Sequence, residues 1–98
     1  MITEIAVLDI KKGEEESFLS AFQNAQKIIS SMKGYISHTL QKSLDKDCRY
    51  LLTVKWETLE DHTTGFRGSE KYIKWKELLH HFYDPFPIVE HYGENIFF

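Results

Sequence analysis

The chain has 98 residues, of which 42% are hydrophobic, 28% charged and 14% aromatic, and this balance predicts one globular domain spanning residues 1–98. The net charge of −3, without a basic block, argues against nucleic-acid binding. The single cysteine, Cys48, excludes an intramolecular disulfide, and no apolar run reaches the roughly 18 residues needed to span a membrane. We therefore expect a cytoplasmic protein without membrane association.

The first half of the chain is predicted to form a strand, a helix and a second strand. Residues 2–10 alternate and are rich in strand-forming residues, which predicts the first strand. Gly13 breaks this pattern, and residues 14–16 are glutamates, which favour a helix N-terminus. Apolar residues then recur at three- and four-residue spacing, predicting an amphipathic helix that stops at Gly34: Phe18, Ala21, Phe22, Ala25, Ile28, Ile29 and Met32. Residues 35–43 are predicted to form the second strand.

The second half of the chain is predicted to form a strand, two helices and a last strand. Residues 49–57 alternate with their apolar side chains on one face. Thr58 and Asp61 have the spacing of a capping box and predict a short helix, and Ser69 is placed to cap the next one. The apolar face of this second helix is formed by Tyr72, Trp75, Leu79 and Phe82. Residues 88–97, after two prolines, are predicted to form the last strand.

This order of elements, β-α-β-β-α-β, predicts an α+β fold of the ferredoxin-like kind with an antiparallel sheet. In the first strand Ile5 and Val7 point to one face of the sheet, while Ala6 and Leu8 point to the other. Helices cover only one face of such a sheet, so the second apolar row needs another cover. A second copy of the same sheet is the simplest cover, and we therefore expect a symmetric homodimer.

The segment from Tyr50 to His62, YLLTVKWETLEDH, carries a resemblance to a known family. Together with Phe66-Arg67-Gly68-Ser69 it resembles the antibiotic biosynthesis monooxygenase (ABM) family, in which a strand ending in Trp-Glu is followed by a capped turn and a helix carrying His. This resemblance implies a dimeric α+β barrel with a pocket between sheet and helices in each subunit. Relatives of known function include cofactor-independent monooxygenases acting on phenolic polyketides, haem-degrading enzymes, and proteins acting on small signalling metabolites.

The haem-degrading branch of this family has an Asn in the first strand, a Trp after the third strand and an iron-ligating His about one element later. The corresponding positions here hold Ala6, Val7 or Leu8 for the Asn, Gly65 for the Trp, and Trp75 or Lys76 for the His. The haem-degrading alternative therefore remains only through a shifted ligand such as His80 or His81.

His62 is the predicted catalytic residue, because an imidazole can take a proton from a phenol or an enol near neutral pH. An electron-rich anion formed in this way can reduce dioxygen itself, so we expect no flavin or other cofactor. The structural alternative is a half-buried histidine held by hydrogen bonds. The five histidines are scattered along the chain, and we expect no metal site.

The predicted binding pocket for a small hydrophobic or aromatic molecule has an aromatic lining, since flat rings stack on planar ligands. Its candidate residues are His38, Trp56, Phe66, Tyr72, Trp75 and Phe82. For each aromatic residue among them, ordinary core packing is the default role, because a small domain needs large residues in its core. Two functions consequently stay open: a monooxygenase, or a dimeric small-molecule-binding protein without catalysis.

Overall fold

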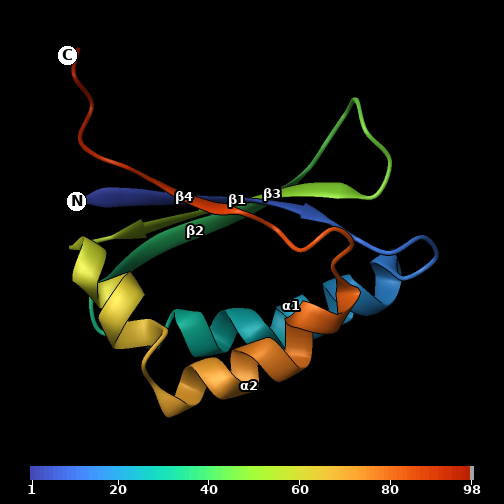
Figure 1. Cartoon of the computed structure of the whole chain (residues 1–98), viewed down its shortest axis with the longest axis horizontal. Helices are drawn as coiled ribbons and strands as arrows, with labels where there is room; N and C mark the ends of the chain where they lie inside the picture. The colour runs from blue at the N-terminus through green and yellow to red at the C-terminus, as the bar shows by residue number, and fades with distance from the viewer. Residues whose placement is uncertain (98) are drawn as a thin grey trace.

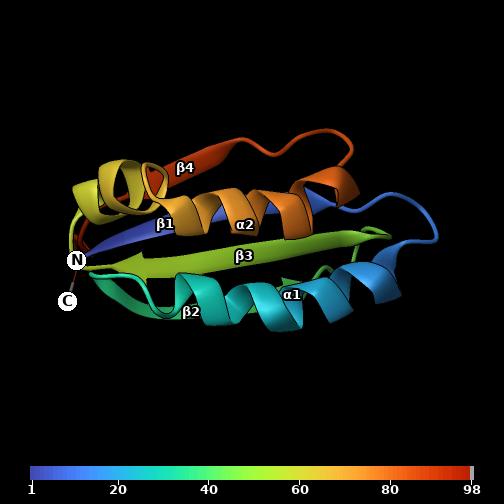
Figure 2. The same ribbon diagram turned by 90° about the horizontal axis from the view of Figure 1, so that it is seen from below.

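The computed structural model describes residues 1–97 and contains a four-stranded sheet with two α-helices on one face (Figures 1 and 2). In chain order the elements are β1 (Ile2–Asp9), α1 (Glu15–Ile29), β2 (Tyr35–Lys42), β3 (Arg49–Trp56), the π-helical turn η1 (Asp61–Phe66), α2 (Glu70–Leu79), the 3-10 turn η2 (His80–Phe82) and β4 (Val89–Tyr92). The strand order is β2-β3-β1-β4, and all neighbouring strands are antiparallel. The predicted ferredoxin-like fold is confirmed. Within the described range no helix combines the length and the apolar character that crossing a membrane requires.

Three of the predicted boundaries are wrong. The second helix ends at Leu79, so Phe82 lies in the 3-10 turn η2 rather than on this helix. The last strand does not extend over residues 88–97 but ends at Tyr92, because Tyr92 pairs with Thr3, one residue from the start of β1, and β4 has then reached the end of its partner. The first helix ends at Ile29 rather than at Gly34. The Ser30 and Ser31 hydroxyls donate to backbone carbonyls of the last turn, which favours the helix end there.

The alternation of β1 places its side chains on two different faces. Glu4, Ala6 and Leu8 lie under the helices and are 5%, 3% and 2% exposed. Ile5 is only partly buried and Val7 is 39% exposed, because they point to the face that no helix covers (Figure 1). The two apolar rows expected from the sequence are therefore present, with one glutamate in the covered row.

Part of the core between sheet and helices is formed by α1. The helix buries one stripe of residues, consisting of Phe18, Phe22, Ala25 and Ile29. Phe18 packs against Tyr50 of β3 and against Phe82, with ring centroids 5.4 and 5.9 Å apart. Burying one side chain of this size contributes about 1.5–3 kcal/mol, so this stripe supplies a large share of the apolar stabilisation.

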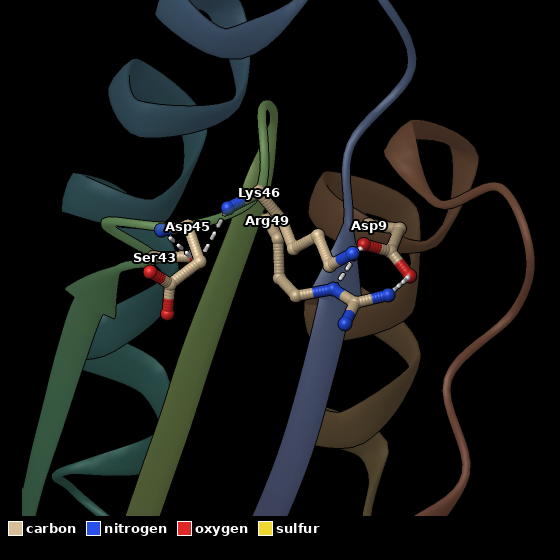
Figure 3. Close-up of polar contacts among 5 residues, drawn as sticks. All are labelled: Asp9, Ser43, Asp45, Lys46 and Arg49. Carbon is tan, nitrogen blue, oxygen red and sulfur yellow. Dashed lines mark hydrogen bonds and ion pairs between the residues drawn. The ribbon is translucent and has the colours of Figure 1, made fainter.

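The connection between β2 and β3 is fixed by polar contacts at the end of the sheet (Figure 3). The Ser43 hydroxyl accepts hydrogen bonds from the backbone N–H groups of Asp45 and Lys46, at 3.1 and 3.0 Å. Arg49 then donates two hydrogen bonds to the Asp9 carboxylate, at 2.8 and 3.1 Å. Since Arg49 and Asp9 are paired in the β1–β3 ladder, this fork supports the strand register.

The capping box predicted after β3 is present and starts the segment that carries His62. The Thr58 N–H donates to Asp61 Oδ2 and the Asp61 N–H donates to Thr58 Oγ1, both at 3.2 Å. The helix that follows widens into the π-helical turn η1 instead of continuing as an α-helix. Gly34, with φ +85°, approaches the same Asp61 side chain so closely that a β-carbon there would overlap it.

Replacing Gly34 by alanine is predicted to lower the free energy of unfolding by more than the same change at Gly13. Both glycines have positive φ, +85° and +83°, and the left-handed conformation costs about 1–2 kcal/mol for a residue with a side chain. Only Gly34→Ala also displaces Asp61 from its capping hydrogen bonds, whereas a β-carbon on Gly13 would have no atom within 4 Å. Urea denaturation of both variants checks this prediction. Equal decreases in the free energy of unfolding for Gly34→Ala and Gly13→Ala would contradict it.

Candidate functional site

A cavity of about 440 Å³ lies under α2, between this helix and the β1–β4 half of the sheet. The sheet contributes the apolar residues Ala6, Leu8, Leu52 and Val89. The opposite side, called the aromatic wall below, consists of Phe66, Tyr72, Trp75, Tyr83 and Phe86. Pro87 and four polar or charged side chains complete the lining, the four being Glu4, His62, Arg67 and His80. The cavity thus combines flat apolar surfaces with a small number of polar groups, as ligand sites commonly do.

The polar end of the cavity is formed by Glu4 of β1 and His62 of η1. Both side chains are almost fully buried, at 5% and 3% exposure. Glu4 Oε1 accepts a hydrogen bond of 2.9 Å from the Trp56 indole, and the same oxygen lies 3.4 Å from His62 Nε2. The His62 ring stacks on Trp56 with centroids 5.4 Å apart and an interplanar angle of 25°.

His62 also contacts His91 of β4, which is not among the site residues expected from the sequence. The distance between His62 Nδ1 and His91 Nε2 is 2.8 Å, so one of these nitrogens donates to the other. Because β4 is an edge strand and His91 is half-buried, the cluster of Glu4, His62 and His91 extends from the cavity towards the surface.

Burial shifts the proton affinities of this cluster in opposite directions. Removal from water raises the pKa of Glu4, although the Trp56 hydrogen bond and the positive charge of Arg67 act against this. Burial lowers the pKa of His62 to about 3, and Arg67 and His91 act in the same direction. The pKa of His91 is also lowered, by burial and then by Arg67. At neutral pH His62 is therefore a neutral imidazole.

Arg67 is exposed at the rim of the cavity, and its charge acts on all three members of the cluster. Within residues 1–97 its guanidinium forms no ion pair with a carboxylate. An arginine in this position is available to an anionic group of a bound molecule. In the same described range no three His, Cys, Asp or Glu side chains are grouped so that they could hold a metal ion.

The structure brings four of the predicted site residues to the cavity and leaves three outside its lining. His62, Phe66, Tyr72 and Trp75 line it. Trp56 lies behind His62 with no exposed surface, and Phe82 packs against α1 in the core. His38 of β2 lies on the half of the sheet away from the cavity, and its ring is hydrogen-bonded to Tyr35 of β2 and Gln26 of α1.

Sequence reasoning missed Glu4, whose Oε1 lies 3.4 Å from His62 Nε2. The available signal was its position in the alternation of β1, where a carboxylate occupies the row of Ala6 and Leu8 that the helices were expected to cover. Charged residues are rarely buried unless they have partners, so a glutamate in this row indicates a paired group or a site. Tyr83, His80 and Phe86 were missed because only the fold of residues 80–87 brings them under α2.

Comparison with known families identifies the relatives of this chain. The model of the family named "antibiotic biosynthesis monooxygenase" matches residues 1–78. The chain belongs to this family. The resemblance noted in the segment from Tyr50 to His62 is thereby confirmed.

Among individual relatives of this ABM protein, the uncharacterised protein YczJ of Bacillus subtilis is 59% identical over 94 residues, which cover 96% of the chain and 99% of YczJ. The crystal structure of a putative antibiotic biosynthesis monooxygenase from Bordetella bronchiseptica is 28% identical, with a TM-score of 0.91 and 97% of both chains covered. SnoaB of Streptomyces nogalater, described as a cofactor-independent oxygenase, shares the fold with a TM-score of 0.82 at 15% identity, over 96% of this chain and 92% of SnoaB.

The buried neutral His62 is predicted to make this ABM protein less stable as the pH falls. Its pKa is about 3 in the folded state against 6.5 in the unfolded chain, so the unfolded state binds the extra proton and stability is lost as the pH falls from about 6.5 towards 3. For His62 alone the loss between pH 7 and pH 5 is about 2 kcal/mol. Glu4, whose pKa is raised, offsets part of this loss at acid pH.

Urea denaturation at several pH values isolates the contribution of His62 through His62→Gln. We expect the wild type to lose stability more steeply below pH 6.5 than this variant, and the exposed His81→Asn to behave like the wild type. If the free energy of unfolding changed with pH in the same way for the wild type and His62→Gln, the prediction would be contradicted.

Proposed function

We propose that this protein is a monooxygenase that oxidises a small aromatic or enolic molecule with dioxygen, the substrate itself supplying the electrons. The observation that carries the proposal is the pairing of an aromatic wall with a buried Glu4–His62 contact inside one cavity. Membership in the ABM family supports it. The fold shared with SnoaB, described as a cofactor-independent oxygenase, agrees with it.

The shape of the cavity favours a planar ligand. Phe66 forms edge-to-face contacts with Tyr72 and Trp75, with centroids 5.2 and 5.5 Å apart and interplanar angles of 80° and 77°. These contacts hold the rings in fixed orientations, so the aromatic wall offers preformed apolar surface. Stacking of a ligand ring on such surface contributes about 0.5–1.5 kcal/mol beyond simple burial.

In the proposed reaction the polar end of the cavity first removes the proton of a substrate hydroxyl, with His62 as the residue expected from the sequence to take part. The exposed guanidinium of Arg67 stabilises the resulting anion. The anion transfers one electron to O₂, and the two radicals combine to form a carbon–oxygen bond. The peroxide then loses water, which leaves a carbonyl on the product.

The second candidate function is ligand binding without catalysis, and the low pKa of His62 favours it, because a neutral imidazole of this kind is a weak base. Thermal shift and oxygen uptake, measured with the same panel of planar phenols, separate the two functions. Ligands that raise the melting temperature without any oxygen uptake would support binding alone.

His62→Ala is predicted to reduce turnover of naphthalene-1,3-diol at least a hundredfold, because it removes a partner of the buried Glu4 carboxyl at the end of the cavity where the proton is transferred. Acid–base groups contribute about 10²–10⁴ in rate to such a step. The measurement is oxygen uptake together with formation of the hydroxynaphthoquinone, after subtraction of the reaction without protein. His81→Asn is the matched control, because His81 is exposed and lies outside the cavity lining. Full turnover by a folded His62→Ala protein would remove His62 from the mechanism.

We also propose that two copies of the chain pair through the uncovered sheet face that carries Ile5 and Val7. The apolar row of this face supports the pairing, because Val7 is 39% exposed in the single chain. The dimer would then leave one cavity on the helix-covered side of each subunit.

Val7→Glu is predicted to convert the dimer to a monomer, because it places a charge in the centre of the paired face. Size-exclusion chromatography with light scattering measures the mass. Ile73→Glu is the matched control, since Ile73 is 54% exposed on α2 and lies on the helix side. A wild-type protein that is monomeric at micromolar concentration would overturn the proposal.

A further inference from the structure

The two oxygens of the Glu4 carboxyl have different surroundings. Oε1 accepts the Trp56 indole proton and lies 3.4 Å from His62 Nε2. Among residues 1–97, Oε2 has no hydrogen-bond partner. In the same range every fully buried side-chain nitrogen or oxygen has a partner, so Oε2 is not fully buried. Since Glu4 lines the cavity, Oε2 retains contact with the cavity space. One oxygen of Glu4 is thus held by the protein, and the other is available to a ligand.

The two ring nitrogens of His62 are both occupied by neighbours. Nε2 lies next to Glu4, and Nδ1 lies 2.8 Å from His91 Nε2. The ring face is stacked on Trp56. His62 therefore has no free lone pair directed at a ligand, although it lies in the cavity lining. Its geometry suits a residue that positions Glu4 rather than one that takes a proton from the substrate.

We propose that Glu4 is the catalytic base of this site, taking the substrate proton on Oε2, and that His62 and His91 are positioning residues that hold Oε1. This inference rests on the proposed oxidation and assigns its proton transfer to a residue of β1. His62 directs Nε2–H at Oε1 and accepts from His91 at Nδ1. Because the substrate proton arrives on Oε2, Oε1 remains an acceptor and His62 keeps the same neutral tautomer in both charge states of Glu4.

The protons balance over the whole reaction with Glu4 as the only group that gains or loses one. Glu4 takes the hydroxyl proton of the substrate and returns it to the peroxide formed with O₂. The Glu4 carboxylate then takes the proton from the carbon that carries the hydroperoxide, the O–O bond breaks, and the departing hydroxide leaves as water with that proton. Naphthalene-1,3-diol and O₂ thus give hydroxynaphthoquinone and water, and the carboxylate is regenerated.

The charges around Glu4 are compatible with this role. Five titratable side chains and one arginine from the other elements line the same cavity or contact His62: Arg67 and His62 after β3, Tyr72 on α2, His80 and Tyr83 at η2, and His91 on β4. Burial raises the pKa of Glu4 above its usual value of 4.5, which makes it a stronger base than an exposed glutamate. His62, with a pKa of about 3, stays neutral and does not compete for the proton.

The ligand-free protein provides the first test, by NMR titration of the Glu4 side-chain carboxyl carbon and of the imidazole nitrogens. We expect Glu4 to titrate with a midpoint above 4.5, and the nitrogen shifts of His62 to show one neutral tautomer, protonated at Nε2, on both sides of this midpoint. Glu4→Gln should remove the carboxyl titration and leave this tautomer in place, since the amide oxygen still accepts and does not titrate. A midpoint at or below 4.5, or a His62 tautomer that changes with the charge of Glu4, would overturn the inference.

The second test is the pH profile of kcat/KM for oxidation of naphthalene-1,3-diol. In the wild type kcat/KM should rise with pH as Glu4 loses its proton. Glu4→Gln should lower it at least a hundredfold and remove this acid limb. His62→Gln, which keeps the carboxyl base, should retain an acid limb at a shifted pH, and His81→Asn should match the wild type. A folded Glu4→Gln protein with wild-type kcat/KM would show that Glu4 is not the base.

The two tests separate this inference from the proposed function. Oxygen uptake by the wild type combined with an ordinary Glu4 titration would retain the oxidation and overturn the role of Glu4. Absence of oxygen uptake by the wild type, whatever the NMR result, would overturn the oxidation and with it the catalytic role of Glu4.

Discussion

The structure of the site depends on the burial of one carboxyl group beneath the helices. Glu4 is 5% exposed, and an unpaired carboxylate at this depth would be strongly destabilising. The Trp56 indole, itself without exposed surface, donates to Glu4, and His62 lies against the same oxygen. Loss of either partner would leave the buried carboxyl with only one of its two contacts, so strand, indole and imidazole form one unit.

Local backbone features bring His62 to this carboxyl. The reciprocal hydrogen bonds of Thr58 and Asp61 begin the helix directly after β3, and the wider π-helical turn then directs His62 and Phe66 inward. Such turns are rare and occur often at functional sites. The side chain of Asp61 packs against Gly34, which joins the start of this helix to the loop before β2.

The aromatic residues are divided between two tasks. On the α1 side they fill the core, where Phe18 packs against Tyr50 and Phe82. On the α2 side the aromatic wall instead borders a cavity of about 440 Å³. The fold is shared by proteins whose sequences have diverged widely. The chemistry of this chain therefore depends on its own cavity residues rather than on its fold.

The sequence by itself determined the order of elements, the two faces of β1, the capping box at Thr58 and the family, because alternation, helical spacing and capping act between residues close in the chain. It also indicated His62. Only the tertiary structure decided that Trp56, Phe82 and His38 lie outside the cavity lining while Glu4 lies within it. Glu4 and His62 are 58 positions apart in the sequence, and their contact depends on how η1 packs across the sheet, which no local pattern records.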